Sequence, residues 1–343
     1  MPSVRLAFMG FGNVGRALGG LLLEKQDELR QRYDLSWHVS GIATGSHGSA
    51  IDPSGLDLRR ALELAAQGES LNRLASAPQT QAGVAFVRTC GADVLFENTP
   101  VDYEAGQPAT AHIQAALEAG MHVVTANKGP VVHAYRPLTD LARQRGRRFL
   151  FESAVMDGAP IFSLWRETLP GCRLNSFRGI LNSTTNMILT SMEAGMGFDD
   201  AVRHCQSIGI AETDPSGDIL GWDAAVKVAA LVTVLMDHPI KPDQVDRRGI
   251  EDLTSEKIEQ ARGDGKRWRL ICAAAREGQR VLASVRPEQV GPQDALFNVA
   301  GTSSSITFYS DTLGPLTITE ENPGPRTTAY GLLADFLNAV AVE

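Results

Sequence analysis

The chain has 343 residues, which is longer than one compact hydrophobic core usually accommodates and fits two domains. Hydrophobic residues make up 43% and charged residues 21%, as in a folded protein rather than a disordered one. Lys plus Arg number 32 and Asp plus Glu 40, for a net charge of -8. An acidic chain repels phosphate backbones, so nucleic acid is excluded as an expected partner.

Cysteine usage and hydropathy indicate the compartment. The four cysteines lie far apart and form no C-x-x-C pair, so we expect four reduced thiols: Cys90, Cys172, Cys205 and Cys272. The first apolar run, residues 4–9, is too short for the core of a signal peptide, and no later run is long enough to span a membrane. We therefore expect a cytoplasmic protein with no membrane partner.

Strand-like and helix-like segments alternate in the first part of the chain. The predicted strands are residues 4–9, 37–44, 93–99, 122–126 and 148–152. The predicted helices are residues 14–29, 58–66, 107–119 and 138–145. This alternation predicts a parallel sheet with helices on both faces, in a first domain that covers residues 1–150.

A glycine-rich turn connects the first predicted strand to the first predicted helix. It reads Gly10-Phe11-Gly12-Asn13-Val14-Gly15. The first glycine permits a tight turn, the second lets the backbone approach a pyrophosphate, and the third lets helix and strand pack closely. A glycine turn without a ligand is the alternative, but the strand–turn–helix context favours a dinucleotide site.

The end of the second predicted strand bears on the choice of cofactor. An acid there would bond the ribose hydroxyl of NAD and repel the 2′-phosphate of NADP. Residues 42–47 contain neither an acid nor an arginine. The sequence therefore permits NADP or NAD, with a lean towards NADP.

The pattern changes after about residue 152. Strands are predicted at residues 176–181, 281–285, 295–299, 305–309 and 316–319, with long helices between some of them. This arrangement predicts an α+β domain with a mixed or antiparallel sheet over residues 151–323. A last helix, residues 328–340, is apolar on one side, and we expect the segment 324–343 to pack back on the first domain.

One predicted helix, residues 221–236, is apolar on almost every face and should be buried. Its two charged residues, Asp223 and Lys227, are four positions apart and share a face. A surface salt bridge would explain the spacing but not the apolar surroundings, because buried charges are costly unless they line a pocket or pair well. A lysine in such a pocket can give and take a proton.

Three carboxylates, Glu212, Asp214 and Asp218, precede this helix. The helix dipole alone favours one or two acids near a helix start. It does not explain why they gather beside a buried lysine. The whole cluster therefore predicts a site rather than a charged surface.

The stretch 207–227 resembles homoserine dehydrogenases, whose signature is G-x-A-E-x-D-P-x-x-D-x-x-G-x-D-A-x-x-K. The matching residues are Gly209, Ala211, Glu212, Asp214, Pro215, Asp218, Gly221, Asp223, Ala224 and Lys227. Other family segments occur in order over nearly the whole chain: the glycine turn, Thr99-Pro100, residues 125–130, Glu152 with Val155, residues 179–182 and residues 184–186.

The resemblance implies a fold and an activity. The fold is α/β, with a Rossmann-type parallel sheet domain plus an α+β domain for substrate binding and dimerisation. The activity is the NAD(P)-dependent interconversion of L-homoserine and L-aspartate 4-semialdehyde, a step of threonine, methionine and isoleucine biosynthesis. The expected assembly is a homodimer formed by the second domain's sheet. The chain ends about where some members continue into a regulatory domain, so we expect no feedback control through that module.

The resemblance also implies residue roles. Lys227 matches the catalytic lysine that moves a proton to or from the substrate oxygen, and Lys128 matches a lysine at the junction of cofactor and substrate. The implied substrate-binding residues are Glu212, Asp223, Asp218 and Thr184. The implied cofactor-binding residues are Gly10, Phe11, Gly12, Asn13, Val14, Gly15, Thr99, Lys128, Gly209 and Gly324. A monovalent cation, Na or K, is implied near Glu152, Val155, Asp157 and Ala159.

Two other classes of function compete with this interpretation. The first is another Rossmann dehydrogenase that acts on an amino-acid aldehyde or keto acid; an aspartate-semialdehyde dehydrogenase would need a nucleophilic cysteine in its own motif, which no cysteine here has. The second is a non-catalytic dinucleotide sensor. It would keep the glycine turn but has no need for Lys227 with Glu212 and Asp223.

Overall fold

A computed structural model describes residues 3–75 and 82–340 of the chain, which divides into two compact units. The first unit comprises residues 1–160 and 324–343, and the second comprises residues 161–323. The first unit thus extends past the expected boundary at residue 150. The extra segment belongs to it because the Asp335 carboxylate accepts from the Glu152 N–H at 2.7 Å and the Ser153 hydroxyl donates to the Thr328 carbonyl at 2.8 Å.

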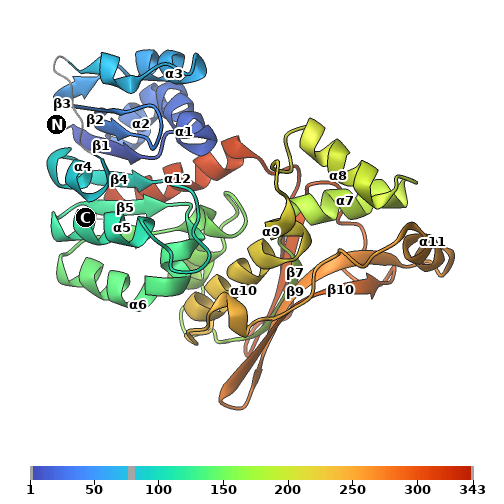
Figure 1. Ribbon diagram of the computed structural model, residues 1–343. Coiled ribbons are helices and arrows are strands. Elements are labelled where there is room, and N and C mark those ends of the chain that lie inside the picture. Colours follow the sequence, from blue (N-terminus) through green and yellow to red (C-terminus); the bar gives the residue numbers. More distant parts are fainter. Residues whose placement is uncertain (1–2, 76–81, 341–343) are drawn as a thin grey trace. The chain divides into compact units, whose positions relative to one another are not determined.

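The first unit is built on a six-stranded sheet with the order β3-β2-β1-β4-β5-β6 (Figure 1). Its strands are β1 (Val4–Met9), β2 (Trp37–Ala43), β3 (Ser49–Leu56), β4 (Val94–Glu97), β5 (His122–Thr125) and β6 (Phe149–Leu150). All neighbours pair in parallel except β2 and β3, which form an antiparallel hairpin. The predicted parallel sheet is confirmed for β2, β1, β4, β5 and β6. The sequence did not predict the antiparallel edge strand β3, which contains Pro53 and Gly55, residues that edge strands tolerate.

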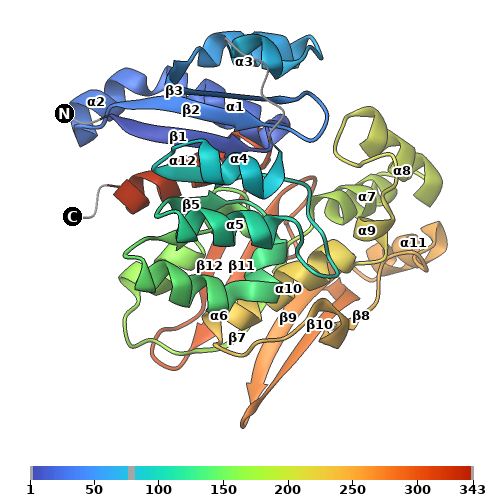
Figure 2. The ribbon, with the colours of Figure 1, turned by 60° about the vertical axis from the view of Figure 1, so that its left-hand side comes forward.

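Helices cover both faces of this sheet, with α4, α5 and α6 on one face in Figure 2. The helices are α1 (Asn13–Glu24), α2 (Gln26–Tyr33), α3 (Leu58–Ala66), α4 (Gly83–Thr89), α5 (Ala109–Glu118), α6 (Lys128–Gln144) and α12 (Pro325–Val340), with short turns η1 (Leu71–Leu74) and η2 (Glu152–Ala154). The predicted helix 14–29 divides at Lys25, which has φ -94° and ψ 8°. The sequence predicts a helix only from residue 138, directly after Pro137, but α6 begins at Lys128. The helix includes Pro137 because the backbone is kinked at Ala134.

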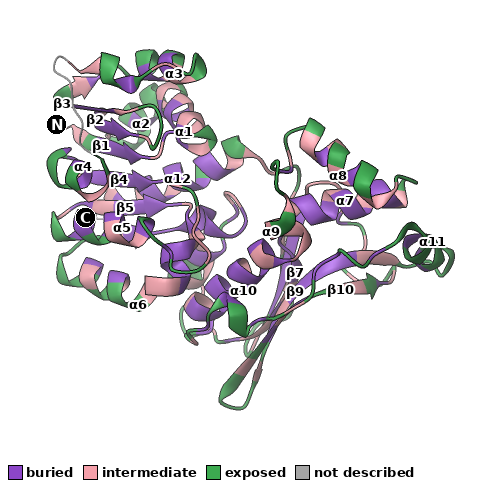
Figure 3. Cartoon of the chain, in the orientation of Figure 1, coloured by how far each residue is buried: buried purple, intermediate pink, exposed green. Residues whose placement is uncertain are grey.

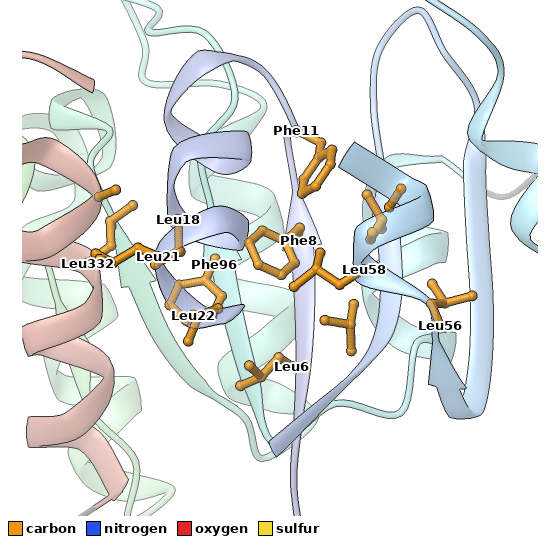
Figure 4. Packing of buried hydrophobic residues seen from close by; sticks show 14 of the residues in the cluster. Leu6, Phe8, Phe11, Leu18, Leu21, Leu22, Leu56, Leu58, Phe96 and Leu332 are labelled. Carbon is orange, nitrogen blue, oxygen red and sulfur yellow. The ribbon is translucent and has the colours of Figure 1, made fainter. Parts of the chain in front are cut away.

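The core of the first unit joins segments from both ends of the chain. Phe8 of β1 packs on Phe96 of β4 with ring centroids 5.2 Å apart, and Phe96 packs edge-on against Phe336 of α12 at 5.8 Å. Leu18 of α1 and Leu332 of α12 belong to the same buried cluster, and Figure 4 shows Leu332 next to Leu21 and Leu18. Helix α12 is therefore part of the first unit's hydrophobic core.

The second unit has a mixed six-stranded sheet with the order β12-β11-β7-β9-β10-β8. Its strands are β7 (Leu174–Ile180), β8 (Asp246–Arg247), β9 (Arg267–Glu277), β10 (Arg280–Val290), β11 (Ser304–Ser310) and β12 (Leu316–Glu320). Every pair is antiparallel except β8 with β10. The strand predicted at 295–299 is wrong: these residues form turns, and their apolar side chains Leu296 and Val299 pack with Ile180 and Ile271.

The helices of the second unit include the buried one that the sequence predicts. They are α7 (Ser183–Glu193), α8 (Phe198–Ser207), α9 (Ser216–Ile219), α10 (Trp222–Leu235) and α11 (Ser255–Gly263), with a short π-helix η3 (Leu164–Thr168) and a 3-10 helix η4 (Pro242–Gln244). Most residues of α10 are buried, as its colouring in Figure 3 shows. This confirms the buried helix predicted from the apolar sequence around Asp223 and Lys227.

Within the described parts of the chain, every helix is too short or too polar to cross a lipid bilayer.

The packing of α12 gives a test of the first unit's core. We expect Phe336→Ala to lower the free energy of unfolding by about 3–5 kcal/mol, because the ring is fully buried and its removal leaves a cavity. Tyr330→Ala is the matched control on the same helix, since Tyr330 is 53% exposed. Urea denaturation followed by far-UV circular dichroism measures both. Equal stability of the two variants would contradict the place of α12 in the core.

Candidate active site

The glycine turn of the first unit lies between β1 and α1. Gly10 has φ +94°, and a Cβ there would lie 2.5 Å from the Asn98 carbonyl oxygen at the end of β4. A Cβ on Gly15 would lie 2.7 Å from the Gly10 carbonyl oxygen. Both contacts are with backbone, which cannot move aside like the end of a side chain. These two glycines are therefore required by the packing of the turn itself.

Gly12 differs from its two neighbours in the turn. A Cβ on Gly12 would meet nothing within 4 Å, and Gly12 occupies the N-cap position of α1 without a capping side chain. The helix thus presents its first N–H groups at an open position, which suits a phosphate. Beside the turn, the Nδ2 and Oδ1 atoms of Asn98 are shielded from solvent and have no hydrogen-bond partner among the described residues. The residues present fit an NAD(P) dinucleotide.

The ends of β4 and β5 carry a polar network next to this turn. The Thr99 hydroxyl donates to the Glu97 carboxylate, and His112 Nδ1 lies 3.3 Å from the same carboxylate. Asn127 Nδ2 donates to the Thr99 carbonyl at 3.0 Å, while Asn127 Oδ1 accepts from the Gly129 N–H and caps α6. Lys128 is the first residue of α6. Asn127 therefore connects Thr99 to the first turn of α6, which begins with Lys128.

Glu97 and His112 are polar residues of this network that the sequence did not suggest. Both are buried, Glu97 completely, and they come from β4 and α5. In the sequence, Glu97 is the last residue of an apolar strand and His112 stands in an apolar helix. Neither position has a signal that distinguishes it from an ordinary strand end or helix interior.

The second unit holds Lys227 between two acceptors. Its Nζ donates to the Leu181 carbonyl at 2.7 Å and lies 3.1 Å from Asp223 Oδ2 one turn earlier on α10. The side chains of Lys227 and Asp223 are 16% and 11% exposed. The Coulomb attraction between charges this well shielded from water is stronger than on a helix surface, and it offsets part of the cost of burying them.

A neighbouring asparagine connects Asp223 to a second carboxylate. Asn182 Nδ2 donates to Asp218 Oδ1 at 2.6 Å and to Asp223 Oδ2 at 3.0 Å. Burial, and then the negative charge of Asp223, raise the pKa of Asp218 above its usual value. Asn182 appears in the sequence only as part of a family segment, without a role. Its N-cap position before α7 and its contacts with α9 and α10 come from the structure alone.

The two remaining predicted substrate residues, Thr184 and Glu212, lie in different surroundings. Thr184 lies in the first turn of α7, where its hydroxyl donates to the Ile210 carbonyl at 3.4 Å, so it joins Asp218, Asp223 and Lys227 in the second unit. Glu212 is exposed on the loop after α8, and its carbonyl accepts from Gln206 Nε2. The structure thus places the Glu212 side chain on an exposed loop rather than among the buried groups.

Two glycines predicted to bind the cofactor end or begin helices. Gly209 has φ +74° and ends α8, with the following N–H of Ile210 donating to the Cys205 carbonyl at 2.9 Å. This left-handed helix end requires glycine whether or not a ligand is present. Gly324 belongs to the first unit, precedes α12 and donates its N–H to the Thr327 hydroxyl at 2.8 Å.

The segment expected to hold a monovalent cation lies entirely in the first unit. Glu152, Val155 and Ala159 are buried, and Asp157 has a left-handed φ of 40°. The Asp157 carboxylate accepts from the Thr328 hydroxyl at 3.0 Å, so this side chain holds α12. Residues 3–75 and 82–340 contain no group of three or more His, Cys, Asp and Glu side chains placed to bind a metal.

The cysteines are free thiols, as the sequence predicts. Burial raises the pKa of Cys90 and Cys205, and it raises the pKa of Cys272, beside Lys227, to about 12. These three thiols stay protonated near neutral pH and are poor nucleophiles. The geometry therefore gives no support to cysteine-based aldehyde oxidation at these positions.

A dinucleotide-binding unit, joined in one chain to a unit that buries a lysine among carboxylates, defines a two-domain NAD(P)-dependent dehydrogenase. Comparison with known families makes this specific. Residues 10–152 match the NAD-binding domain of homoserine dehydrogenase, and residues 160–337 match the homoserine dehydrogenase domain itself. The chain belongs to the homoserine dehydrogenase family, NAD(P)-dependent oxidoreductases that act on a CH–OH group.

Individual relatives agree over almost their full lengths. The chain is 36% identical to an NAD(+)-dependent homoserine dehydrogenase of Pseudomonas canavaninivorans, covering 98% of this chain and 96% of the relative. It is 35% identical to a homoserine dehydrogenase of Methanocaldococcus jannaschii, covering 97% of each. A hyperthermophilic archaeal homoserine dehydrogenase solved in complex with NADPH superimposes with a TM-score of 0.84 at 27% identity, covering 98% of each chain.

The glycine turn yields a paired prediction. Gly12→Ala should leave the unfolding temperature unchanged and raise the KM for the cofactor about tenfold or more, because its Cβ enters the open position where a phosphate would approach. Gly10→Ala should instead destabilise the protein by about 2 kcal/mol or more, because its Cβ meets backbone at a positive φ. Gly20→Ala, on an open part of α1, is the control. Unchanged cofactor kinetics in Gly12→Ala would contradict the assignment of the turn.

Because the pKa of Asp218 is raised, replacing this carboxyl by a neutral side chain should stabilise the folded protein, and the gain should depend on pH. A carboxyl with a raised folded-state pKa binds more protons when folded, so its stability contribution is complete below about pH 3.9 and is lost as pH rises through the folded pKa. Asp218→Asn removes this loss. Thermal unfolding should show a variant more stable than the parent, by a margin that is larger at about pH 8 than at about pH 5. A constant or shrinking margin would refute the cause given for the shift.

Proposed function

We propose that this chain interconverts L-homoserine and L-aspartate 4-semialdehyde, with Lys227 as the group that moves the proton. The observation that carries the proposal is the placement of the Lys227 ammonium, largely buried between the Leu181 carbonyl and Asp223. An alkoxide that forms when an aldehyde accepts hydride needs a proton, and a positioned ammonium can supply it. In the reverse direction the neutral amine takes the proton from the homoserine hydroxyl.

The first unit would hold NAD or NADP through the glycine turn Gly10–Gly15. When bound, the nicotinamide supplies or accepts the hydride. Helix α1 would direct its open N–H groups at the phosphates, with Gly12 allowing close approach. Thr99, fixed by Glu97 and Asn127, would line the nicotinamide end, and Lys128 would place a positive charge at the junction with the substrate. The lean towards NADP from the sequence stays a prediction.

The carboxylates of the second unit would select an amino-acid substrate. Asp218 and Asp223 lie with Thr184 near Lys227, and an ammonium group on the substrate would offset their mutual repulsion. Glu212, on its exposed loop, would complete the contact with the substrate. The second unit is thereby the substrate-binding domain of the proposal, and the first unit, completed by α12, is the dinucleotide-binding domain.

The assembly and the cellular setting are proposed on more general grounds. We propose a homodimer formed through the sheet of the second unit; Leu282 of β10 and Tyr309 of β11 are large apolar side chains exposed on that sheet. The net charge of -8 and the free thiols support a cytoplasmic enzyme without nucleic-acid partners. A Na or K ion would be held mostly by main-chain carbonyls of the buried segment Glu152–Ala159, and activity in Na, K and choline salts tests this.

The decisive variant is Lys227→Ala. We expect kcat for homoserine oxidation to fall by a factor of about 10²–10⁴, since general acid–base catalysis by one side chain is of that size. The KM for the cofactor should stay within about twofold, because the glycine turn belongs to the other unit. Absorbance of the reduced nicotinamide measures both quantities.

Lys266→Ala, at an exposed lysine of the same unit, is the matched control. Near-parental turnover in Lys227→Ala would remove the proposed mechanism. A parent protein that binds NADPH yet turns over neither homoserine nor the semialdehyde would instead support the dinucleotide sensor.

A further inference from the structure

Two consecutive residues at the end of β7 contact the lysine cluster. The Leu181 carbonyl accepts from Lys227, and the Asn182 side chain contacts both carboxylates of the cluster. We propose that Asn182 is a positioning residue for the reaction: it joins Asp218 to Asp223 and thereby holds the counter-ion of Lys227 in place. This inference rests on the function proposed above and adds a residue that acts through Asp223 rather than on the substrate.

The orientation of the Asn182 amide follows from its partners. Its Oδ1 accepts from the Thr185 N–H and the Thr185 hydroxyl, both at 2.8 Å. A backbone N–H can only donate, so the atom facing it must be the oxygen. The NH2 group then faces Asp218 and Asp223, whose ionised carboxylates can only accept. The reversed amide would place its oxygen against two carboxylates, so one arrangement satisfies all the partners.

The same oxygen of Asp223 serves both neighbours. Oδ2 accepts from Asn182 Nδ2 at 3.0 Å and lies 3.1 Å from Lys227 Nζ. A carboxylate held by one donor could rotate and carry the ammonium with it. Two donors on one oxygen fix the carboxylate, and the Leu181 carbonyl fixes the ammonium from the other side. Leu181 therefore holds Lys227 directly, and Asn182 holds it indirectly through Asp223.

Asn182 also reduces a repulsion that burial makes severe. Asp218 and Asp223 bring two negative charges into a largely buried space that contains one lysine, and the charge of Asp223 contributes to the raised pKa of Asp218. An NH2 group donating to both carboxylates lowers that repulsion without adding charge. A further titratable group beside the cluster, the Cys272 thiol of β9, has a pKa of about 12 and adds no charge near neutral pH.

The isosteric variant Asn182→Asp separates the two functions of this side chain. Aspartate keeps an oxygen to cap α7, so the fold should persist, but it turns a second oxygen towards Asp218 and Asp223. We expect kcat to fall about 100-fold at about pH 9, because the displaced carboxylate and lysine no longer hold the reacting geometry. The KM for the cofactor should be unchanged.

The pH profile is the readout that a purely structural role would not move. Protonation of one of the three carboxylates in Asn182→Asp restores an O–H donor between them. As the pH falls from about 9 to about 6, one of these carboxyls gains a proton and becomes a donor. The ratio of variant to parent kcat should therefore rise at least about fivefold over this range. A ratio close to one at both pH values, in a folded variant, would overturn the proposal.

Two further variants cover the remaining outcomes. Asn182→Ser keeps a capping hydroxyl, but this side chain is too short to reach the carboxylates. Its kcat should therefore be low, and the ratio of its kcat to the parental kcat should not rise at low pH. A parental kcat in Asn182→Ser would overturn the proposal even if Asn182→Asp fails to fold. Thr254→Ala removes the cap of α11 and should lower the unfolding temperature without changing kinetics. If Asn182→Asp keeps the parental kcat while Lys227→Ala is inactive, only the positioning role of Asn182 is refuted. An active Lys227→Ala refutes the proposed role of Lys227, and a parent protein without homoserine turnover refutes the proposed function itself.

Discussion

A lysine ammonium on a buried, apolar helix stays charged only if the surrounding chain supplies hydrogen-bond acceptors for it. Several segments of the second unit meet this requirement at Lys227. Helix α10 is buried along most of its length, yet it carries Asp223 and Lys227 on one face. Removing an ion from water costs several kcal/mol unless partners replace the lost solvation. Asp223 provides one partner from within the helix, and the Leu181 carbonyl provides the other from the end of β7.

That requirement explains why distant segments of the chain meet at this point. The segment from Leu181 to Thr185 follows β7, begins α7 and also faces α10. Asn182 makes this possible because its Oδ1 caps α7 while its Nδ2 donates to Asp223 of α10. Asp218 of α9 is drawn into the same network. A single amide thus links three helices and a strand, and the local capping chemistry and the electrostatics of the cluster depend on the same side chain.

The sequence predicted those parts of the site that depend on local pattern. Apolar residues on every face indicated that α10 is buried, and a spacing of four placed Asp223 and Lys227 together; both follow from helix geometry alone. The hairpin partner β3 was missed because its Pro53 and Gly55 suppress the strand pattern. The strand predicted at 295–299 was wrong because burial of Leu296 and Val299 does not require a ladder. The roles of Asn182 and Glu97 depend on contacts between segments far apart in sequence, which no periodicity encodes.

A second buried cation in the same unit shows what distinguishes a structural charge from the proposed catalytic one. Arg269 of β9 is fully buried, and its guanidinium donates to both oxygens of Glu193 and to the carbonyls of Trp268 and Val299. Arginine also stays charged at any pH that a folded protein tolerates. Lys227 has three N–H donors, and among the described residues Leu181 and Asp223 provide two acceptors. In the proposed reaction the remaining donor would face a substrate oxygen, and an amine, unlike a guanidinium, can exchange its proton. The ability to exchange a proton, more than burial itself, therefore distinguishes the lysine proposed for catalysis from the arginine that stabilises the fold.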